Sequence, residues 1–201
     1  MGQRKVLLGF TNEPVSEGLH ICHLYSDEVE RNRVMTKFIG SGLESREKVL
    51  CLVNALTPDE MKRNLEEMGM DVSGLSALDA RSAYCPTGNF DKSRMLEAIR
   101  SFYLDALDEG YQGARGAGDM AWALETHASE ADLIEYEARV NQIVSDHPFT
   151  ACCQYDAHRF SGQMLMDILS IHPVTIVKGQ LVWNPFYIAP GDFLREFLAR
   201  S

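Results

Sequence analysis

The amino-acid sequence predicts an α/β fold. The expected architecture is a three-layer α/β/α sandwich, with helices on both faces of a mostly parallel, doubly wound sheet and an antiparallel hairpin at one edge. Apolar runs of strand length alternate along the chain with amphipathic segments of helix length, which is the pattern of repeated β-α-β units. Near the end, two apolar runs are joined by Lys178 and Gly179, which is typical of a hairpin turn.

The first strand is expected in "HICHLY", from His20 to Tyr25. An acidic helix should follow it directly. We expect Ser26 to cap this helix, with Asp27 and Glu28 in its first turn, because carboxylates favour the positive end of the helix dipole.

The second β-α unit carries the clearest local signals. "EKVLCLV", Glu47–Val53, is a continuous apolar run of the kind buried on both faces of a sheet. The next segment, Leu56–Gly69, predicts a helix with Thr57 as N-cap, Pro58 as its first residue and Glu60 as capping-box partner.

The remaining elements repeat this pattern, and we see no internal repeat or linker. We therefore expect one domain over residues 1–201. In chain order the predicted elements are a strand in Leu75–Tyr84, a helix in Asp91–Tyr111, a strand in Gly113–Asp119, a helix in Ser129–His147 capped by Ser129, a strand in Phe149–Asp156, a helix in Ser161–Pro173 and the hairpin in Val174–Asn184.

The composition is that of an ordinary globular protein, with 45% hydrophobic and 24% charged residues. A net charge of -10 argues against direct binding to nucleic acid or to an anionic membrane surface. No apolar stretch reads as a membrane span or a signal peptide. The five cysteines mostly lie in or beside apolar runs, as reduced core thiols do, so we expect a cytoplasmic protein.

The stretch Gly18–Glu30 concentrates histidine, cysteine and tyrosine. Strand alternation places His20 and Cys22 on one face and His23 on the other, so a Cys22–His23 nucleophile is disfavoured. Zinc needs converging ligands, and the other candidates lack paired spacing: Cys85, His127, Cys152 and Cys153. We therefore expect no metal, no cofactor and no catalytic residue.

A phosphate-binding loop is also missing. After the first strand the chain reads "LYSDEVERN", with no glycine and with carboxylates where phosphates would lie. The glycines of Gly113–Asp119 are not followed by Lys-Ser or Lys-Thr, and close packing explains them better.

The ends of the predicted strands indicate a small-molecule pocket. In open α/β sheets the ligand crevice lies beyond the carboxyl ends of the strands. Aromatic and hydrogen-bonding residues gather there, and we expect Tyr25, Asp119, Trp122, Gln154 and Tyr155 to bind the ligand.

Two arginines near these ends need partners. Arg159 is a candidate second cation of the pocket, or it pairs with Asp156. Arg115 lies in a strand of small residues, where an inward guanidinium requires a carboxylate or an anionic ligand, and we expect Asp119 or Glu125 to be its partner.

Several stretches together resemble the MEDS family, the methanogen/methylotroph DcmR-type sensory domain. They are "HICHLY" with its acidic helix, "FIGSGLESREKVLCLV", "GARGAGDMAWAL", "LIEYEARVNQIV" and "ACCQYDAHRFSGQMLMDILSIHPVTIVKGQLVWNPFY", and they span about residues 18–187. The resemblance implies a RecA/KaiC-like fold that has lost its phosphate loop. It also maps the family motif H-x-C-x-x-Y onto His20, Cys22 and Tyr25, which joins His20 and Cys22 to the expected ligand-binding set.

The resemblance implies a sensor of small, partly apolar molecules such as hydrocarbon derivatives, and not an enzyme. Output is expected through a signalling partner such as a histidine kinase or a transcription regulator, and the domain is expected to form a homodimer. The alternatives are a degenerate RecA-like nucleotide-binding protein and a metal-dependent hydrolase that uses His20 and Cys22.

Overall fold

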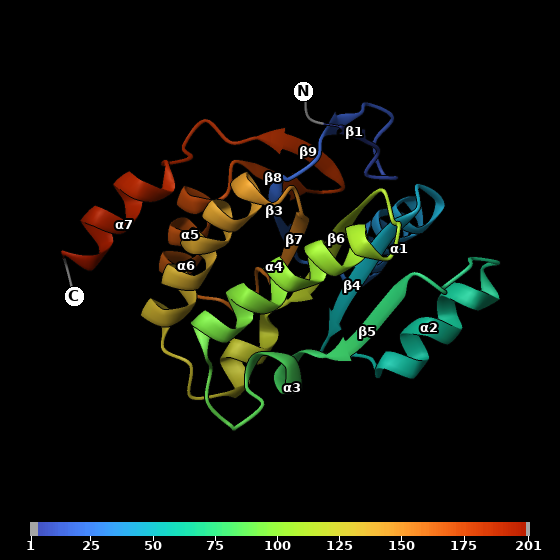
Figure 1. Cartoon of the computed structure of the whole chain (residues 1–201). Helices are drawn as coiled ribbons and strands as arrows, with labels where there is room; N and C mark the ends of the chain where they lie inside the picture. Colours follow the sequence, from blue (N-terminus) through green and yellow to red (C-terminus); the bar gives the residue numbers. More distant parts are fainter. Residues whose placement is uncertain (1–3, 200–201) are drawn as a thin grey trace.

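The computed structural model describes residues 4–199, and a seven-stranded sheet lies at its centre (Figure 1). The strand order is β5-β4-β6-β7-β3-β8-β9, with every neighbouring pair parallel except β8 and β9. The strands of this sheet are β3 (His20–Tyr25), β4 (Glu47–Val53), β5 (Leu75–Asp79), β6 (Gly113–Asp119), β7 (Thr150–Asp156), β8 (Val174–Val177) and β9 (Gln180–Trp183). A separate small hairpin, β1 (Lys5–Val6) and β2 (Val15–Ser16), precedes them.

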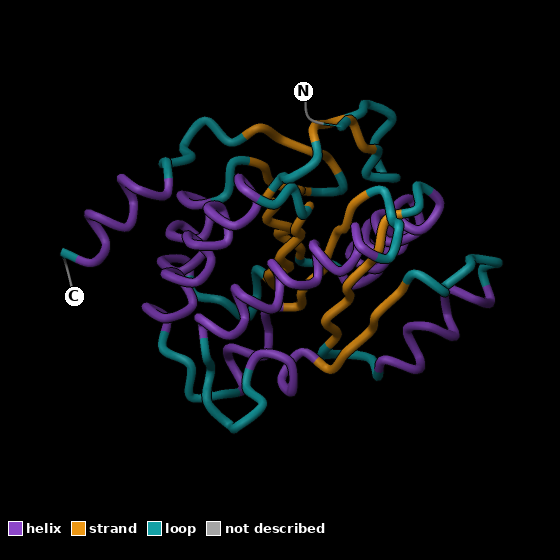
Figure 2. The backbone as a smooth tube through the Cα atoms, in the orientation of Figure 1, coloured by secondary structure: helices purple, strands orange, loops and turns teal. Residues whose placement is uncertain are grey.

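Helices flank the strands in two layers (Figure 2). The helical segments are α1 (Glu28–Glu44), α2 (Pro58–Glu67), α3 (Ala80–Tyr84), α4 (Lys92–Asp108), the 3₁₀ helix η1 (Met120–Glu125), α5 (Glu130–Asp146), α6 (Gly162–Ile171) and α7 (Pro190–Leu198). One core cluster lies between the sheet and the layer of α1 and α2, and a larger one lies between the sheet and the layer of α3 to α7. The predicted sandwich with an antiparallel edge hairpin is confirmed. No helix within residues 4–199 is long and apolar enough to cross a membrane.

The strand order reverses between β3 and β7. From β3 the chain crosses through α1 to β4 and then to the edge strand β5, whereas from β7 it crosses through α6 to β8 on the other side of β3. Consequently α1 and α6 lie on opposite faces of the sheet. A crevice for ligands is expected at such a switch point, at the carboxyl ends of the two strands.

Local capping signals were mostly predicted correctly. Thr57 and Glu60 form the expected capping box, and Ser129 caps α5. The expected cap at Ser26 is wrong. The N-cap of α1 is Asp27, whose carboxylate accepts a hydrogen bond of 2.8 Å from the Glu30 amide, because Ser26 lies one residue too early to reach it.

The strand predicted over Leu75–Tyr84 is shorter than expected. It ends at Asp79, whose carboxylate accepts a hydrogen bond from the Ser82 amide and so starts the short helix α3. The small residues of β6 pack closely, as predicted. A Cβ on Gly116 would lie 2.5 Å from the Phe149 ring.

The partner expected for Arg115 is also wrong, because Asp119 and Glu125 do not bind it. Arg115 is fully buried, and its Nε donates to Glu47 at the start of β4. Two further bonds go to the carbonyl oxygens of Phe38 (2.8 Å) and Leu7 (3.1 Å). Distance along the strand explains this, since Arg115 lies near the amino end of β6, four residues or roughly 13 Å from Asp119, where β6 pairs with β4.

Glu47→Ala should lower the free energy of unfolding by about 3–5 kcal/mol, because it leaves the buried Arg115 guanidinium without its carboxylate. Urea denaturation measures this loss. Glu109→Ala is the matched control, since Glu109 is half exposed in its pair with Lys48 and should cost less than about 1 kcal/mol. Equal losses in the two variants would contradict the assignment.

Candidate functional site

The carboxyl ends of β3, β6 and β7 hold a group of polar side chains around Arg31, which we name the arginine cluster. The Arg31 guanidinium donates from Nη2 to Asp119 (2.7 Å), from Nε to Gln154 (2.9 Å) and from Nη1 to Glu28 (2.9 Å). It also lies 5.0 Å from the centre of the Tyr25 ring, within cation–π range. These five residues constitute the arginine cluster.

Sheet register explains why the members of the arginine cluster meet. Asp119 pairs with Gln154 across β6 and β7, and Tyr25 ends β3 beside Asp156 of β7. Arg31 lies one turn into α1, which packs on this face of the sheet. Asp119 also accepts a hydrogen bond of 3.0 Å from the Ala121 amide, which fixes its carboxylate.

The arginine cluster keeps its charges despite burial. Burial alone lowers the pKa of Arg31, but Asp119, Tyr25 and Glu28 together outweigh burial and the net shift is upward. Burial raises the pKa of Tyr25, which stays neutral. One guanidinium therefore faces the carboxylates of Asp119 and Glu28, and the cluster carries a net charge of about -1.

A cleft of about 110 Å³ lies against the arginine cluster, between α1, α2 and the end of β4. Its wall combines apolar and polar side chains, as small-molecule sites do. The apolar lining includes Met35, Ile39, Leu56 and Met61, and the polar lining includes Arg31, Asn32, Asn54 and Gln154.

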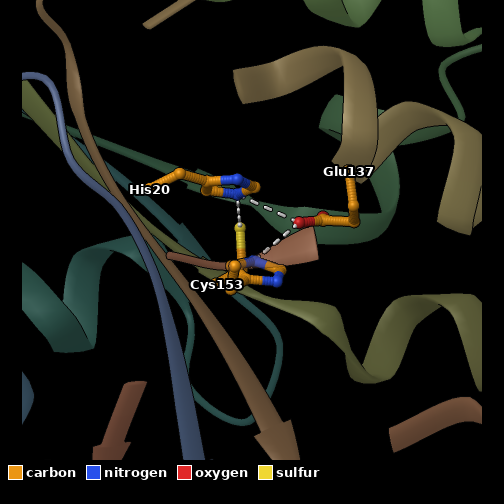
Figure 3. Close-up of side chains that lie close together, drawn as sticks. His20, Glu137 and Cys153 are labelled. Carbon is orange, nitrogen blue, oxygen red and sulfur yellow. Dashed lines mark hydrogen bonds and ion pairs between the residues drawn. The ribbon is translucent and has the colours of Figure 1, made fainter. Parts of the chain in front are cut away.

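A second group of polar side chains lies on the opposite face of β3 and β7, and we name His20, Glu137, Cys153 and His172 the histidine cluster. Its side chains converge from β3, α5, β7 and the residue after α6, and three of them are labelled in Figure 3. Glu137 Oε2 lies 3.1 Å from His20 Nε2 and 3.2 Å from His172 Nε2. The Cys153 sulfur lies 3.5 Å from His20 Nε2.

Burial dominates the electrostatics of the histidine cluster. Burial and the neighbouring His172 lower the pKa of His20 to about 4. Burial alone would raise the pKa of Glu137, but the neighbouring imidazoles of His172 and His20 lower it to about 2. Burial also raises the pKa of the Cys153 thiol well above its ordinary value.

The structure brings some of the predicted ligand-binding residues together and separates others. Tyr25, Asp119 and Gln154 meet in the arginine cluster, whereas His20 belongs to the histidine cluster. Cys22 is fully buried in the core on the same face as His20, as alternation predicted.

The other predicted residues lie away from the cleft. Trp122 is fully buried and its ring stacks on Tyr84 at 4.4 Å. Tyr155 is also fully buried, with its ring 6.2 Å from that of His172. Arg159 does not line the cleft, and its guanidinium does not bond the Asp156 side chain. It is bonded to Glu125 at the surface, at 2.9 Å.

Sequence reasoning missed the residues that organise both clusters. Arg31 carried one usable signal, because it lies near the start of the helix that follows β3, and three and four residues before the buried Val34 and Met35. Glu137 and His172 carried none, since their meeting with His20 depends on how α5 and α6 pack on the sheet.

The described architecture defines a class of fold, the KaiC-like α/β sandwich. Two solved structures share that fold, each with a TM-score of 0.65. The KaiC-like protein PH0186 of Pyrococcus horikoshii OT3 is 15% identical and aligns over 88% of this chain and 81% of its own. The flagellar accessory protein FlaH of Methanocaldococcus jannaschii is 14% identical and aligns over 94% and 90%. At these identities the likeness shows the fold alone.

The chain belongs to the MEDS family, the methanogen/methylotroph DcmR sensory domain, whose family model matches residues 19–173. The transcriptional repressor DcmR of Methylorubrum extorquens (strain DSM 6343 / CIP 106787 / DM4) is 30% identical over 159 residues. These residues are 78% of this chain and 58% of DcmR, so the chain spans little more than half of that relative. A regulatory sensory role follows from the family.

Arg31→Leu should destabilise the protein by about 3–5 kcal/mol, because it leaves the buried Asp119 carboxylate without its cation. The double variant Arg31→Leu/Asp119→Leu should recover a large part of this loss, and denaturant titration of the full cycle measures the coupling. Glu28→Gln is the control. Glu28 is exposed, so this change should cost less than about 1 kcal/mol. Additive single losses would show that Arg31 and Asp119 do not interact.

Proposed function

We propose that this chain is a cytoplasmic, non-catalytic sensor domain that binds a small, uncharged and partly apolar molecule in the cleft beside Arg31. Binding changes its shape or association, and a partner protein such as a histidine kinase or a transcription regulator receives the signal. The homodimer expected from the sequence stays a prediction. The five cysteines are free and buried, which supports a reducing compartment.

One observation carries the proposal: the arginine cluster lies at the switch point of the sheet, where folds of this kind bind ligands, and the cleft lies beside it at the carboxyl end of β4. The cleft volume of about 110 Å³ corresponds to roughly three or four water molecules, and so to a ligand of a few non-hydrogen atoms. Met35 and Met61 supply adaptable apolar contact, while Gln154 supplies hydrogen bonds.

Charge selects against anions. Arg31 is already neutralised by Asp119 and Glu28, and Asp27 and Glu30 add further negative charge at the start of α1. An anionic ligand entering this cleft would meet a net negative field. A neutral molecule avoids that cost and gains from the apolar wall.

Arg31 also connects the cleft to the rest of the fold. Its bonds join α1 to β6 through Asp119 and to β7 through Gln154. A ligand that competes for the Gln154 amide changes one of these bonds, and a difference in affinity between the two arrangements is sufficient to shift α1 against the sheet.

The rival nucleotide-binding function is disfavoured by the start of α1. The helix N-terminus that would receive phosphate has its amide at Glu30 occupied by the Asp27 carboxylate, at 2.8 Å. The rival metal-dependent hydrolase is disfavoured because the histidine cluster is buried, which denies a substrate access.

Mg-ATP and Mg-ADP should therefore show no binding at millimolar concentration in isothermal titration calorimetry, and no hydrolysis above a mutation-insensitive background. Asp27→Ser with Glu28→Gly removes both carboxylates and provides a gain-of-binding comparison. Saturable binding by the unchanged chain, lost on Asp119→Asn, would establish the nucleotide-binding alternative instead.

Ligand binding can be located with methyl-labelled methionine, because two of the nine methionines, Met35 and Met61, line the cleft. One- to four-carbon alcohols, amides and alkyl halides serve as probes, with acetate as the anionic comparison. At least one neutral probe should shift the methyl signals of Met35 and Met61 in NMR spectra, whereas acetate should not.

Matched tryptophan variants test the location. Met61→Trp fills the cleft and should abolish the shift at Met35, while Met166→Trp, at an exposed position on α6, should leave it unchanged. Equal shifts at Met166 and Met61, or shifts that survive Met61→Trp in folded protein, would place the ligand elsewhere.

A further inference from the structure

The histidine cluster contains an arrangement of hydrogen-bond acceptors that calls for a cation. His172 Nδ1 lies 2.7 Å from the carbonyl oxygen of Ile168. A carbonyl only accepts, so Nδ1 carries a proton, and a ring with that single proton presents a lone pair at Nε2. That lone pair faces Glu137 Oε2 at 3.2 Å, so two acceptors point at each other.

The Glu137 carboxylate also needs a nearby positive charge. The carboxylate is fully buried in α5, and neither of its oxygens has an assigned hydrogen-bond partner among the described residues. A buried carboxylate without a compensating positive charge is costly. A proton on one imidazole would relieve one contact, but it would not explain why the Cys153 sulfur converges on the same point.

The distances match those of a metal site. Four ligands in a tetrahedron with bonds of about 2.0–2.3 Å lie roughly 3.3–3.7 Å apart. The contacts to His20 Nε2 and His172 Nε2 measure 3.1, 3.2 and 3.5 Å, and all four ligand atoms lie within 4.8 Å of one another. The bond from His172 Nδ1 to a backbone carbonyl is the outer contact that orients metal-bound histidines.

The donor set selects the kind of ion. Two imidazole nitrogens, one sulfur and one carboxylate oxygen suit a borderline-soft ion such as Zn²⁺, whereas Mg²⁺ and Ca²⁺ prefer oxygen alone. One thiolate and one carboxylate also balance a charge of +2, so the loaded site is neutral in its buried surroundings.

We propose that His20, Glu137, Cys153 and His172 together bind one zinc-class divalent ion. The Cys153 thiol releases its proton to solvent, and four metal–ligand bonds form. Four protein ligands leave no position for water, so the ion is structural and not catalytic. It joins β3, β7, α5 and the connection from α6 to β8. The absence of a metal expected from the sequence rested on residue spacing, which cannot detect ligands from four separate elements.

The test uses the full chain, stripped of metal with a chelator and then titrated with Co²⁺ and Zn²⁺. Co²⁺ should bind one per chain, giving a thiolate-to-cobalt charge-transfer band and the intense visible bands of tetrahedral cobalt, and Zn²⁺ should displace it. Zn²⁺ at a hundredfold excess over its dissociation constant should raise the midpoint of thermal unfolding by about 5–10 °C.

Cys153→Ser should remove the charge-transfer band and weaken Co²⁺ binding at least tenfold, and His172→Gln should weaken it similarly. Cys152→Ser is the matched control, because Cys152 is the neighbouring buried cysteine of β7 but lies on the opposite face. The wild-type spectrum needs no variant and stays decisive if Cys153→Ser fails to fold. No cobalt band in folded metal-free protein, or a band that persists in Cys153→Ser, would overturn the proposal.

Discussion

The pairing of β3 with β7 is the constraint on which both polar clusters depend. Six residue pairs run in register from His20 and Ala151 at one end to Tyr25 and Asp156 at the other, between segments about 130 positions apart in the chain. Because the two strands are parallel and adjacent, their carboxyl ends meet, and their side chains alternate between the same two helical layers. A one-residue shift in this pairing register would turn the side chains of one strand to the opposite faces, and the residues of both clusters would no longer meet.

The two faces receive different environments from this one pairing. On the α1 face, Gln154 meets Arg31 beside a cleft, so the polar groups there remain within reach of a small molecule. On the α5 face, Cys153 meets His20 where both side chains are buried, so these polar groups are out of reach of a small molecule. The two strands thus separate the site proposed for the ligand from the site proposed for the ion.

The sequence predicted the features that depend on local chemistry. Alternating strand and helix patterns predicted the sandwich, and the rule about carboxyl ends identified Tyr25, Asp119 and Gln154. That rule predicts at which edge of the sheet a residue lies, but not how deeply its side chain is buried. Trp122 follows the same edge and yet turns inward to stack on Tyr84. The Arg115–Glu47 pair and the histidine cluster depend on which strands and helices become neighbours. The spacing of residues along the sequence does not predict this.

The proposed ion site and the proposed ligand site are physically connected, because each includes one of two consecutive residues of β7. The two proposals are still tested independently. Cys153 and Gln154 are consecutive residues on opposite faces, so whatever fixes the first limits the movement of the second. An ion on the α5 face would anchor β7 to β3, α5 and the start of β8. Strain from a ligand on the α1 face would then be relieved mainly by α1, whose hold on β6 and β7 at this edge includes the bonds of Arg31. A rigid strand with a movable helix beside it is the two-state element that a sensor requires.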